Sequence, residues 1–190
     1  MKKILTPLGL KIICFVLLVL ATAGFFVFES SLTIRILVLL LGLIGLFQIN
    51  KLPEFLVLID LYLALYVLYN IRYGLAVPMS IILVMVIILA IFLFYVNFHL
   101  KEGQPLPRER LWVYLLVIGL LVLEVFLTMS FWPFDPKTKT LTVVTCFYIF
   151  SRAVYFQANN MLSLKRMSGI LAVSTVLLGL LFGLSYWLGF

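Results

Sequence analysis

Charged side chains are scarce in this sequence. Asp, Glu, Lys and Arg make up 11% of its 190 residues, whereas about 25% is typical of soluble domains. Hydrophobic residues make up 65%, and the mean hydropathy is +1.27. So few polar residues cannot cover the surface of a water-soluble fold, which excludes a soluble enzyme, a nucleic-acid-binding domain and a disordered chain. The composition therefore predicts an integral membrane protein.

Histidine and cysteine, the side chains that most often hold metals and haem, are almost missing. His99 is the single histidine, so a bis-histidine haem site is excluded, and no local Cys/His cluster indicates zinc. Cys14 and Cys146 each lie in an apolar run, where a cysteine usually behaves as a small buried hydrophobic residue. The G-x-S-x-G, P-loop, HExxH and dinucleotide-binding patterns are also missing, and no Ser/His or paired-Asp arrangement stands out. We therefore expect no enzyme activity, no cofactor and no metal.

Long hydrophobic runs take up most of the chain. A membrane-spanning helix needs about 20 mostly apolar residues, within a range of about 17–25. The runs are separated by short connections that carry helix caps and turn residues, such as Glu29-Ser30-Ser31 and the Trp132-Pro133-Phe134-Asp135-Pro136 turn. The pattern predicts an all-α, polytopic transmembrane bundle of about seven helices, forming a single domain over residues 1–190. The predicted spans are residues 8–28, 32–48, 53–70, 77–100, 111–131, 141–158 and 169–190.

Basic residues gather on one side of the predicted bundle, as they do on the cytoplasmic side of membrane proteins. With the N-terminus in the cytoplasm, the inner segments hold Lys2, Lys3, Lys11, Lys51, Lys101, Arg108, Arg110, Lys165 and Arg166. The outer segments then hold Arg35, Arg72, Lys137 and Lys139. This distribution predicts that the N-terminus lies inside and the C-terminus outside. The net charge of +7 is thus a signal of topology, and we expect no nucleic acid as a partner.

The first 24 residues allow two interpretations. Lys2 and Lys3, an apolar stretch and then Ala21-Thr22-Ala23 form the pattern of a cleavable signal peptide. The apolar run continues through Phe28, however, and another span follows almost at once, which favours a first membrane-spanning helix. Cleavage would remove that span and leave the topology of the rest unchanged.

Asp60, Glu124 and Arg152 lie well inside predicted spans. A charge at the bilayer centre costs at least about 2.5–3.5 kcal/mol, so each of these groups needs a partner or a function. At a rise of about 1.5 Å per residue, Asp60 and Arg152 lie about 9 and 12 Å from the cytoplasmic side, and Glu124 lies about 21 Å from it. The matching depths predict an ion pair between Asp60 and Arg152.

A polar stripe follows one side of the sixth predicted helix. Tyr148, Arg152 and Tyr155 recur there at intervals of three or four residues, and Thr145 and Asn159 continue the stripe. Lipid cannot satisfy such groups, so the stripe must face other helices or a water-filled cavity.

Two interpretations of these intramembrane groups stay open. In the first, Asp60, Glu124 and Arg152 line a site for a proton, an ion or a small solute. In the second, a buried ion pair and hydrogen-bonding tyrosines only fix which helices are neighbours. We favour the second, because so few charged residues form no recognisable transport pattern.

The last predicted helix carries small side chains at four-residue spacing. Thr175, Gly179 and Gly183 form a face that lets another helix approach closely. We expect this face to pack inside the bundle, with contact to a second copy or a partner subunit as the alternative.

The C-terminal third carries the short motifs Glu124-Val125-Phe126, Phe131-Trp132-Pro133, Phe147-Tyr148, Lys165-Arg166 and Trp187. With these motifs it resembles a group of uncharacterised polytopic membrane proteins from candidate-phylum bacteria. The resemblance implies a multi-pass membrane protein and assigns no functional residue.

The sequence as a whole predicts a small multi-pass membrane protein of the cytoplasmic membrane of a prokaryote. Its predicted role is that of a non-enzymatic subunit or scaffold of a membrane complex, with the Asp60–Arg152 pair setting the register of the helices. The alternative is a transporter or substrate-binding component for an ion or small solute that uses Asp60, Glu124 and Arg152. The expected partners are the lipid bilayer and either a second copy of the chain or another membrane subunit.

Overall fold

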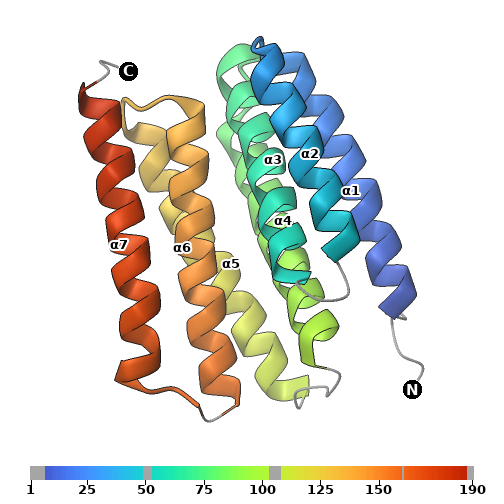
Figure 1. The fold of residues 1–190 in the computed structure, drawn as a ribbon, viewed down its shortest axis with the longest axis vertical. Coiled ribbons are helices and arrows are strands. Elements are labelled where there is room, and N and C mark those ends of the chain that lie inside the picture. The colour runs from blue at the N-terminus through green and yellow to red at the C-terminus, as the bar shows by residue number, and fades with distance from the viewer. Residues whose placement is uncertain (1–6, 49–52, 103–107, 160, 188–190) are drawn as a thin grey trace. The chain divides into compact units, whose positions relative to one another are not determined.

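The computed structural model of the chain describes residues 7–48, 53–102, 108–159 and 161–187 (Figure 1). All regular secondary structure in these ranges is helical, which confirms the predicted all-α fold. The helices are α1 (Pro7–Phe28), α2 (Leu32–Gln48), α3 (Pro53–Gly74), α4 (Met79–Glu102), α5 (Arg108–Phe131), α6 (Pro136–Ala158) and α7 (Leu164–Trp187).

Most of these helices are long and apolar enough to cross a membrane. Six qualify by length and composition, namely α1, α3, α4, α5, α6 and α7. α2 is a shorter apolar helix of 17 residues, at the lower limit of about 17 for a span. The chain is therefore a multi-pass, membrane-type helical protein. Its orientation and any cleavage near the N-terminus stay predictions, and Lys2, Lys3 and Lys51 lie outside the described residues.

α6 begins at Pro136, ahead of the predicted start at residue 141. The carboxylate of Asp135 accepts hydrogen bonds from the backbone N–H groups of Lys137 (3.0 Å) and Thr138 (3.3 Å), and proline fits the first helical position because it has no N–H to satisfy. The first turns of α6 are also buried, with Thr138 at 8% and Thr140 at 0% exposure. Lys139, which we expected at the outer water interface, is 4% exposed.

α7 also begins earlier than predicted, at Leu164 instead of residue 169. The hydroxyl of Ser163 accepts a hydrogen bond from the backbone N–H of Arg166 (3.3 Å), as expected for a residue that caps the start of a helix. In both helices a polar cap lies outside the apolar run, so the helix is longer than the run.

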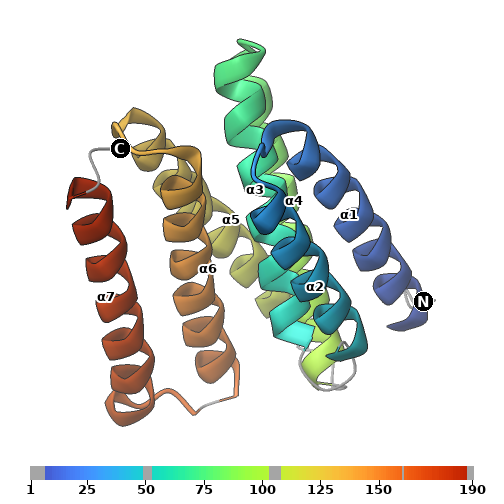
Figure 2. The ribbon, with the colours of Figure 1, turned by 45° about the horizontal axis from the view of Figure 1, so that its top comes forward.

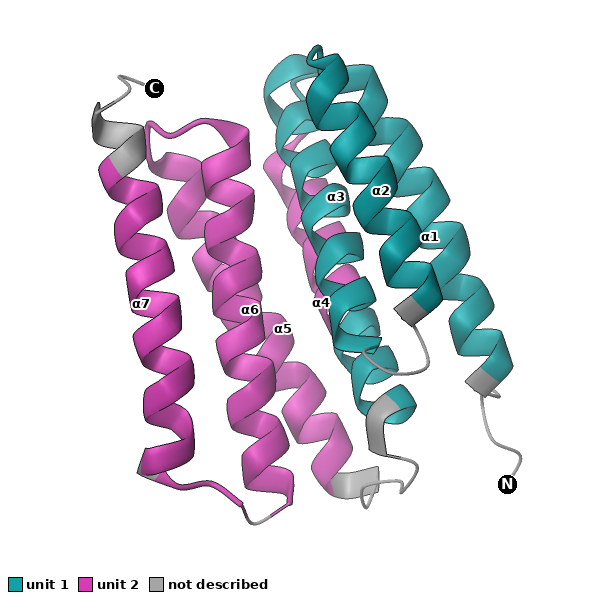
Figure 3. Cartoon of the chain, viewed as in Figure 1, with its two compact units in different colours: residues 1–77, 92–105 teal, residues 78–91, 106–190 magenta. Residues whose placement is uncertain are grey.

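The chain divides into two compact units (Figure 3). Unit 1 comprises residues 1–77 and 92–105, which contain α1, α2, α3 and the second part of α4. Unit 2 comprises residues 78–91 and 106–190, which contain the first part of α4 with α5, α6 and α7. The organisation of residues 1–190 as a single domain stays a prediction.

α3 is the central helix of unit 1. It packs against both α1 and α2, which also contact each other, and the three helices run side by side in Figures 1 and 2. Glycines allow the close approach. A Cβ on Gly24 of α1 would lie 2.9 Å from a methyl carbon of Val67 in α3, and a Cβ on Gly45 of α2 would lie 3.1 Å from one of Leu56. At these two glycines the helix backbone therefore lies so close to α3 that a larger side chain would not fit.

α6 is the central helix among the last three, all of which belong to unit 2. It packs against α5 on one side and α7 on the other. Gly119 of α5 lies against Ile91 of α4, with 3.0 Å between the position of a Cβ and the Cγ1 of Ile91. The rings of Trp132 and Phe134, in the α5–α6 turn, lie 5.6 Å apart, and both contact Phe182 of α7 at 6.2 and 5.3 Å. This aromatic cluster holds one end of α7 against the turn.

Candidate functional site

Asp60 lies in α3 and is 1% exposed. Neither oxygen of its carboxylate has a hydrogen-bond partner within the described part of the chain. Buried polar groups are normally hydrogen-bonded, because burial removes the water that would otherwise solvate them. Asp60 is therefore a buried acid in unit 1 whose desolvation is not offset by a hydrogen bond from the described residues.

The side chain of Asp60 lies on the α1 side of α3. Asp60 and Val67 are two helical turns apart and share a face of α3, and Val67 contacts Gly24 of α1. Cys14, a fully buried residue of α1, is within electrostatic reach of Asp60. The carboxyl group thus lies on the side of α3 that contacts α1.

Glu29 is a second buried carboxylate of unit 1, and sequence reasoning assigned it only a helix-capping role. It is 3% exposed. Its Oε1 accepts a hydrogen bond from the backbone N–H of Ser31 (3.0 Å), and its Oε2 accepts one from the hydroxyl of Tyr66 (3.3 Å). The ring of Tyr66 packs against Phe25 at 4.7 Å. Glu29 therefore ties the α1–α2 connection to α3, and this role is structural.

Arg35 completes the same end of unit 1. Its Nε donates a hydrogen bond to the backbone carbonyl of Glu29 (2.6 Å), and its guanidinium lies 5.8 Å from the centre of the Phe26 ring. A helical turn of α2 is thereby attached to the end of α1. No separate function needs to be assigned to this arginine.

Arg152 lies on α6 in unit 2 and is half-buried. Its guanidinium sits 5.4 Å from the centre of the Tyr148 ring, one turn earlier on the same helix, which places a cation over an aromatic face. Further along the stripe, the side chain of Asn159 donates to the backbone carbonyl of Tyr155 (3.0 Å), and Tyr155 packs against Phe156 at 5.7 Å.

Two threonines of α6 donate hydrogen bonds within their own helix. The hydroxyl of Thr142 donates to the carbonyl of Thr138 (2.9 Å), and that of Thr145 donates to the carbonyl of Leu141 (2.8 Å). Within the stripe, the side chains of Thr145 and Asn159 are thus hydrogen-bonded inside α6. Hydroxyls bonded in this way do not need a water-filled cavity.

Glu124 lies on the side of α5 that faces away from the other helices of unit 2. Both Glu124 and Thr128, one turn later, are exposed, and the Thr128 hydroxyl donates to the backbone carbonyl of Glu124 (2.9 Å). The Glu124 carboxylate makes no hydrogen bond or ion pair with any residue that the structure describes. Buried residues such as Val122 and Phe126 occupy the opposite side of α5.

The three intramembrane charges do not form one cluster within either unit. Asp60 belongs to unit 1, whereas Glu124 and Arg152 belong to unit 2. The Asp60–Arg152 ion pair therefore stays a prediction. Within unit 2, Glu124 and Arg152 form no ion pair. The described residues contain no group of His, Cys, Asp and Glu side chains that could hold a metal ion.

The small-residue face of α7 is open within unit 2. Thr175, Gly179 and Gly183 are exposed, and no atom lies within 4 Å of the position of a Cβ on either glycine. α7 instead contacts its neighbours through residues such as Ser174, which is buried, and Phe182. What packs on the small-residue face stays a prediction.

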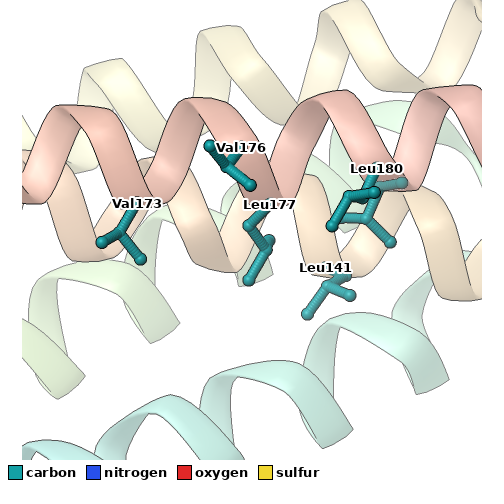
Figure 4. A pocket seen from close by; sticks show the side chains of 6 residues that line it. Leu141, Val173, Val176, Leu177 and Leu180 are labelled. Carbon is teal, nitrogen blue, oxygen red and sulfur yellow. The ribbon is translucent and has the colours of Figure 1, made fainter.

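An apolar groove of about 370 Å³ runs along α7 (Figure 4). Its lining consists of Leu141, Val173, Val176, Leu177, Leu180 and Leu181. Such a lining fits hydrocarbon and offers no side-chain hydrogen bond to a polar solute.

Comparison of the chain with protein-family models, curated proteins and solved structures found no match. The predicted likeness of the C-terminal third to candidate-phylum membrane proteins stays a prediction.

Proposed function

We propose that this chain is a non-enzymatic subunit or scaffold of a membrane protein complex, and that a partner covers the outer side of α5. The observation that supports this function is the exposed carboxylate of Glu124. Glu124 lies seven positions before Phe131 and fourteen positions after Arg110, the two ends of the apolar span within α5, which correspond to about 10 and 21 Å along the helix.

Lipid cannot supply a hydrogen-bond partner for the Glu124 carboxyl group at this depth. Hydrocarbon offers no hydrogen bond, and an isolated polar group there costs several kcal/mol. Lysine and arginine can extend long stems to the headgroups, but a glutamate side chain is shorter and reaches less far. A polar group of another membrane-embedded protein would satisfy the carboxyl, and intramembrane carboxylates normally face protein for this reason.

The experiment that tests this function measures the mass of the particle in native membranes. Membranes that contain the tagged chain would be extracted with a polymer that retains lipid, and the particle size compared for the wild type, Glu124→Leu and the matched polar variant Glu124→Gln. We expect the wild type and Glu124→Gln in particles that hold more protein than one 21.7-kDa chain, and Glu124→Leu in smaller ones. A wild-type chain that is always alone would overturn the proposal.

Asp60 supports a second candidate function, the transport of a proton, an ion or a small solute. A buried carboxyl group without a hydrogen-bond partner is a group that can take up and release a proton within the membrane. The test is a flux assay in vesicles loaded with a pH-sensitive dye, comparing the wild type with Asp60→Asn. Asp135→Asn, outside the spans, is the control. Flux that Asp60→Asn abolishes and Asp135→Asn retains would support transport, and wild-type flux no greater than that of empty vesicles would refute it.

A further inference from the structure

The outer side of α5 has the residue spacing of a helix that pairs with another helix. We call this surface the α5 outer face and define it as Val113, Val117, Leu120, Glu124, Leu127 and Phe131. Successive members are four and three residues apart in alternation. Leu127 is half-exposed and the other members are exposed, with Leu120 at 60% and Phe131 at 83%.

This alternation has a known geometric meaning. Positions four and three residues apart line the seam of two helices that wrap around each other with a left-handed twist, the usual crossing in membrane bundles. A single polar residue within an otherwise apolar seam fixes which residues meet and how many helices associate. Glu124 occupies that place in the α5 outer face, between Leu120 and Leu127.

A carboxyl group is also able to pair with its own copy. When protonated, it carries one hydrogen-bond donor and at least one acceptor, so two carboxyl groups can bond reciprocally. An arginine or lysine has donors only and cannot do this. Two copies inserted with the same orientation are related by a two-fold axis along the membrane normal, and such an axis brings Glu124 of each copy to the same depth.

We propose that two copies of this chain associate in the membrane through the α5 outer face, with their Glu124 carboxyl groups hydrogen-bonded to each other across a two-fold axis. This inference rests on the proposed function and names its partner. The apolar members of the face, such as Val117 and Leu120, pack against their own copies in the second chain. A different chain would have to place a hydrogen-bonding group at this depth, whereas a second copy does so by symmetry.

The test measures dimerisation of the purified full chain in lipid vesicles, by energy transfer between two fluorescent labels over a range of protein-to-lipid ratios. We expect wild-type dimers and, for Glu124→Leu, association weakened by about 10-fold, because the hydrogen bonds across the axis are lost. Glu124→Gln keeps a donor and an acceptor and should associate almost as well as the wild type. Association that Glu124→Leu leaves unchanged would overturn the proposal.

Disulfide cross-linking supplies an independent readout of the geometry. In a background of Cys14→Ala and Cys146→Ala, Leu120→Cys is expected to form a disulfide-linked dimer, because residues on a two-fold seam bring their Cα atoms within about 7 Å. Val173→Cys on α7 is equally accessible to the membrane, at 69% exposure, and is the matched control that should stay monomeric. Equal cross-linking of the two variants would show random collision and contradict the proposed interface.

The outcomes also separate this inference from the proposed function. A purified chain that is monomeric in vesicles, but is part of a larger particle in native membranes only when Glu124 is present, would keep the function and reject the second copy as the partner. A chain that is monomeric in both settings would reject both.

Discussion

Replacing Gly24 with alanine would place a methyl group against Val67 at the contact between α1 and α3. The added Cβ would lie 2.9 and 3.2 Å from the two methyl carbons of Val67, whereas carbon atoms in ordinary contact are about 3.5–4.0 Å apart. Val67 cannot easily turn away, because its methyl groups are attached to Cβ and a β-branched side chain in a helix has one strongly preferred rotamer. The two helices must therefore separate.

The expected loss in the free energy of unfolding follows from the close contact, and a matched control isolates it from the effect of helix propensity. Inserting a methyl group into a filled interface costs about 1–3 kcal/mol, and alanine returns up to about 1 kcal/mol through its higher helix propensity. Gly179→Ala gains the same propensity without a clash, because no atom lies within 4 Å of its added Cβ. We expect Gly24→Ala to be less stable than Gly179→Ala by about 1–3 kcal/mol.

The assay is reversible unfolding of the purified chain in mixed micelles of mild detergent and dodecyl sulfate, followed by circular dichroism. Val67→Ala removes the two methyl carbons, so the double variant with Gly24→Ala should lose at least about 1 kcal/mol less than the sum of the single losses. Equal stabilities of Gly24→Ala and Gly179→Ala, or strictly additive losses in the double variant, would refute the reasoning.

Further predictions use the same unfolding assay. Asp60→Leu is expected to raise the free energy of unfolding by about 1–3 kcal/mol, because it removes a buried group without a hydrogen-bond partner. A lower free energy of unfolding for Asp60→Leu would instead indicate that Asp60 has a polar partner. A double-mutant cycle with Arg152→Gln would then test the predicted ion pair. Asp135→Ala is expected to cost about 0.5–2 kcal/mol through loss of the α6 cap, whereas Asp135→Asn should cost little; equal losses would contradict the capping role. Tyr66→Phe is expected to cost about 1 kcal/mol by removing the hydrogen bond to Glu29, and an unchanged stability would show that this bond contributes nothing.

The number and position of the helices could be predicted because a membrane restricts which backbone conformations can cross it. Every backbone group in hydrocarbon must be hydrogen-bonded within its own segment, so an apolar run of sufficient length is a helix. The starts of α6 and α7 were predicted too late for the same reason. The apolar run marks only the hydrophobic part of each helix, whereas Asp135 and Ser163 cap the helix several residues earlier, where only the capping residue signals its start.

The neighbours of the intramembrane charges could not be predicted. Depth along the membrane normal follows from the helical rise, and it placed Asp60 and Arg152 at similar levels. The depth of a residue does not show from which side of its helix the side chain projects. Helices that are apolar on all sides also carry no sequence pattern to show which side faces protein. The contact of Val67 with Gly24 supplies that direction and places Asp60 beside α1.

Glu29 was missed as a buried group because it lies between two apolar runs, where a charged residue normally meets water. The one signal in the sequence is Tyr66 of α3, whose hydroxyl donates to Glu29. Many tyrosines in apolar helices only pack against their neighbours, so this signal does not identify the partner. The exposure of Glu124 was likewise beyond sequence reasoning, since its spacing from Leu120 and Thr128 fits an inner face as well as an outer one.

The length of α2 bears on the lipid that would surround it. Its 17 residues extend about 25 Å, against about 30 Å for the hydrocarbon core of a typical bilayer. Leu37, Leu40 and Ile44 on its surface are all exposed. If α2 crosses the bilayer, thinning of the lipid around it by several ångströms is one way to match its length, at a cost of fractions of a kcal/mol for each ångström of mismatch. The other six helices have 22 to 24 residues and are long enough for the full hydrocarbon core, so the thinning would be confined to the lipid that touches α2.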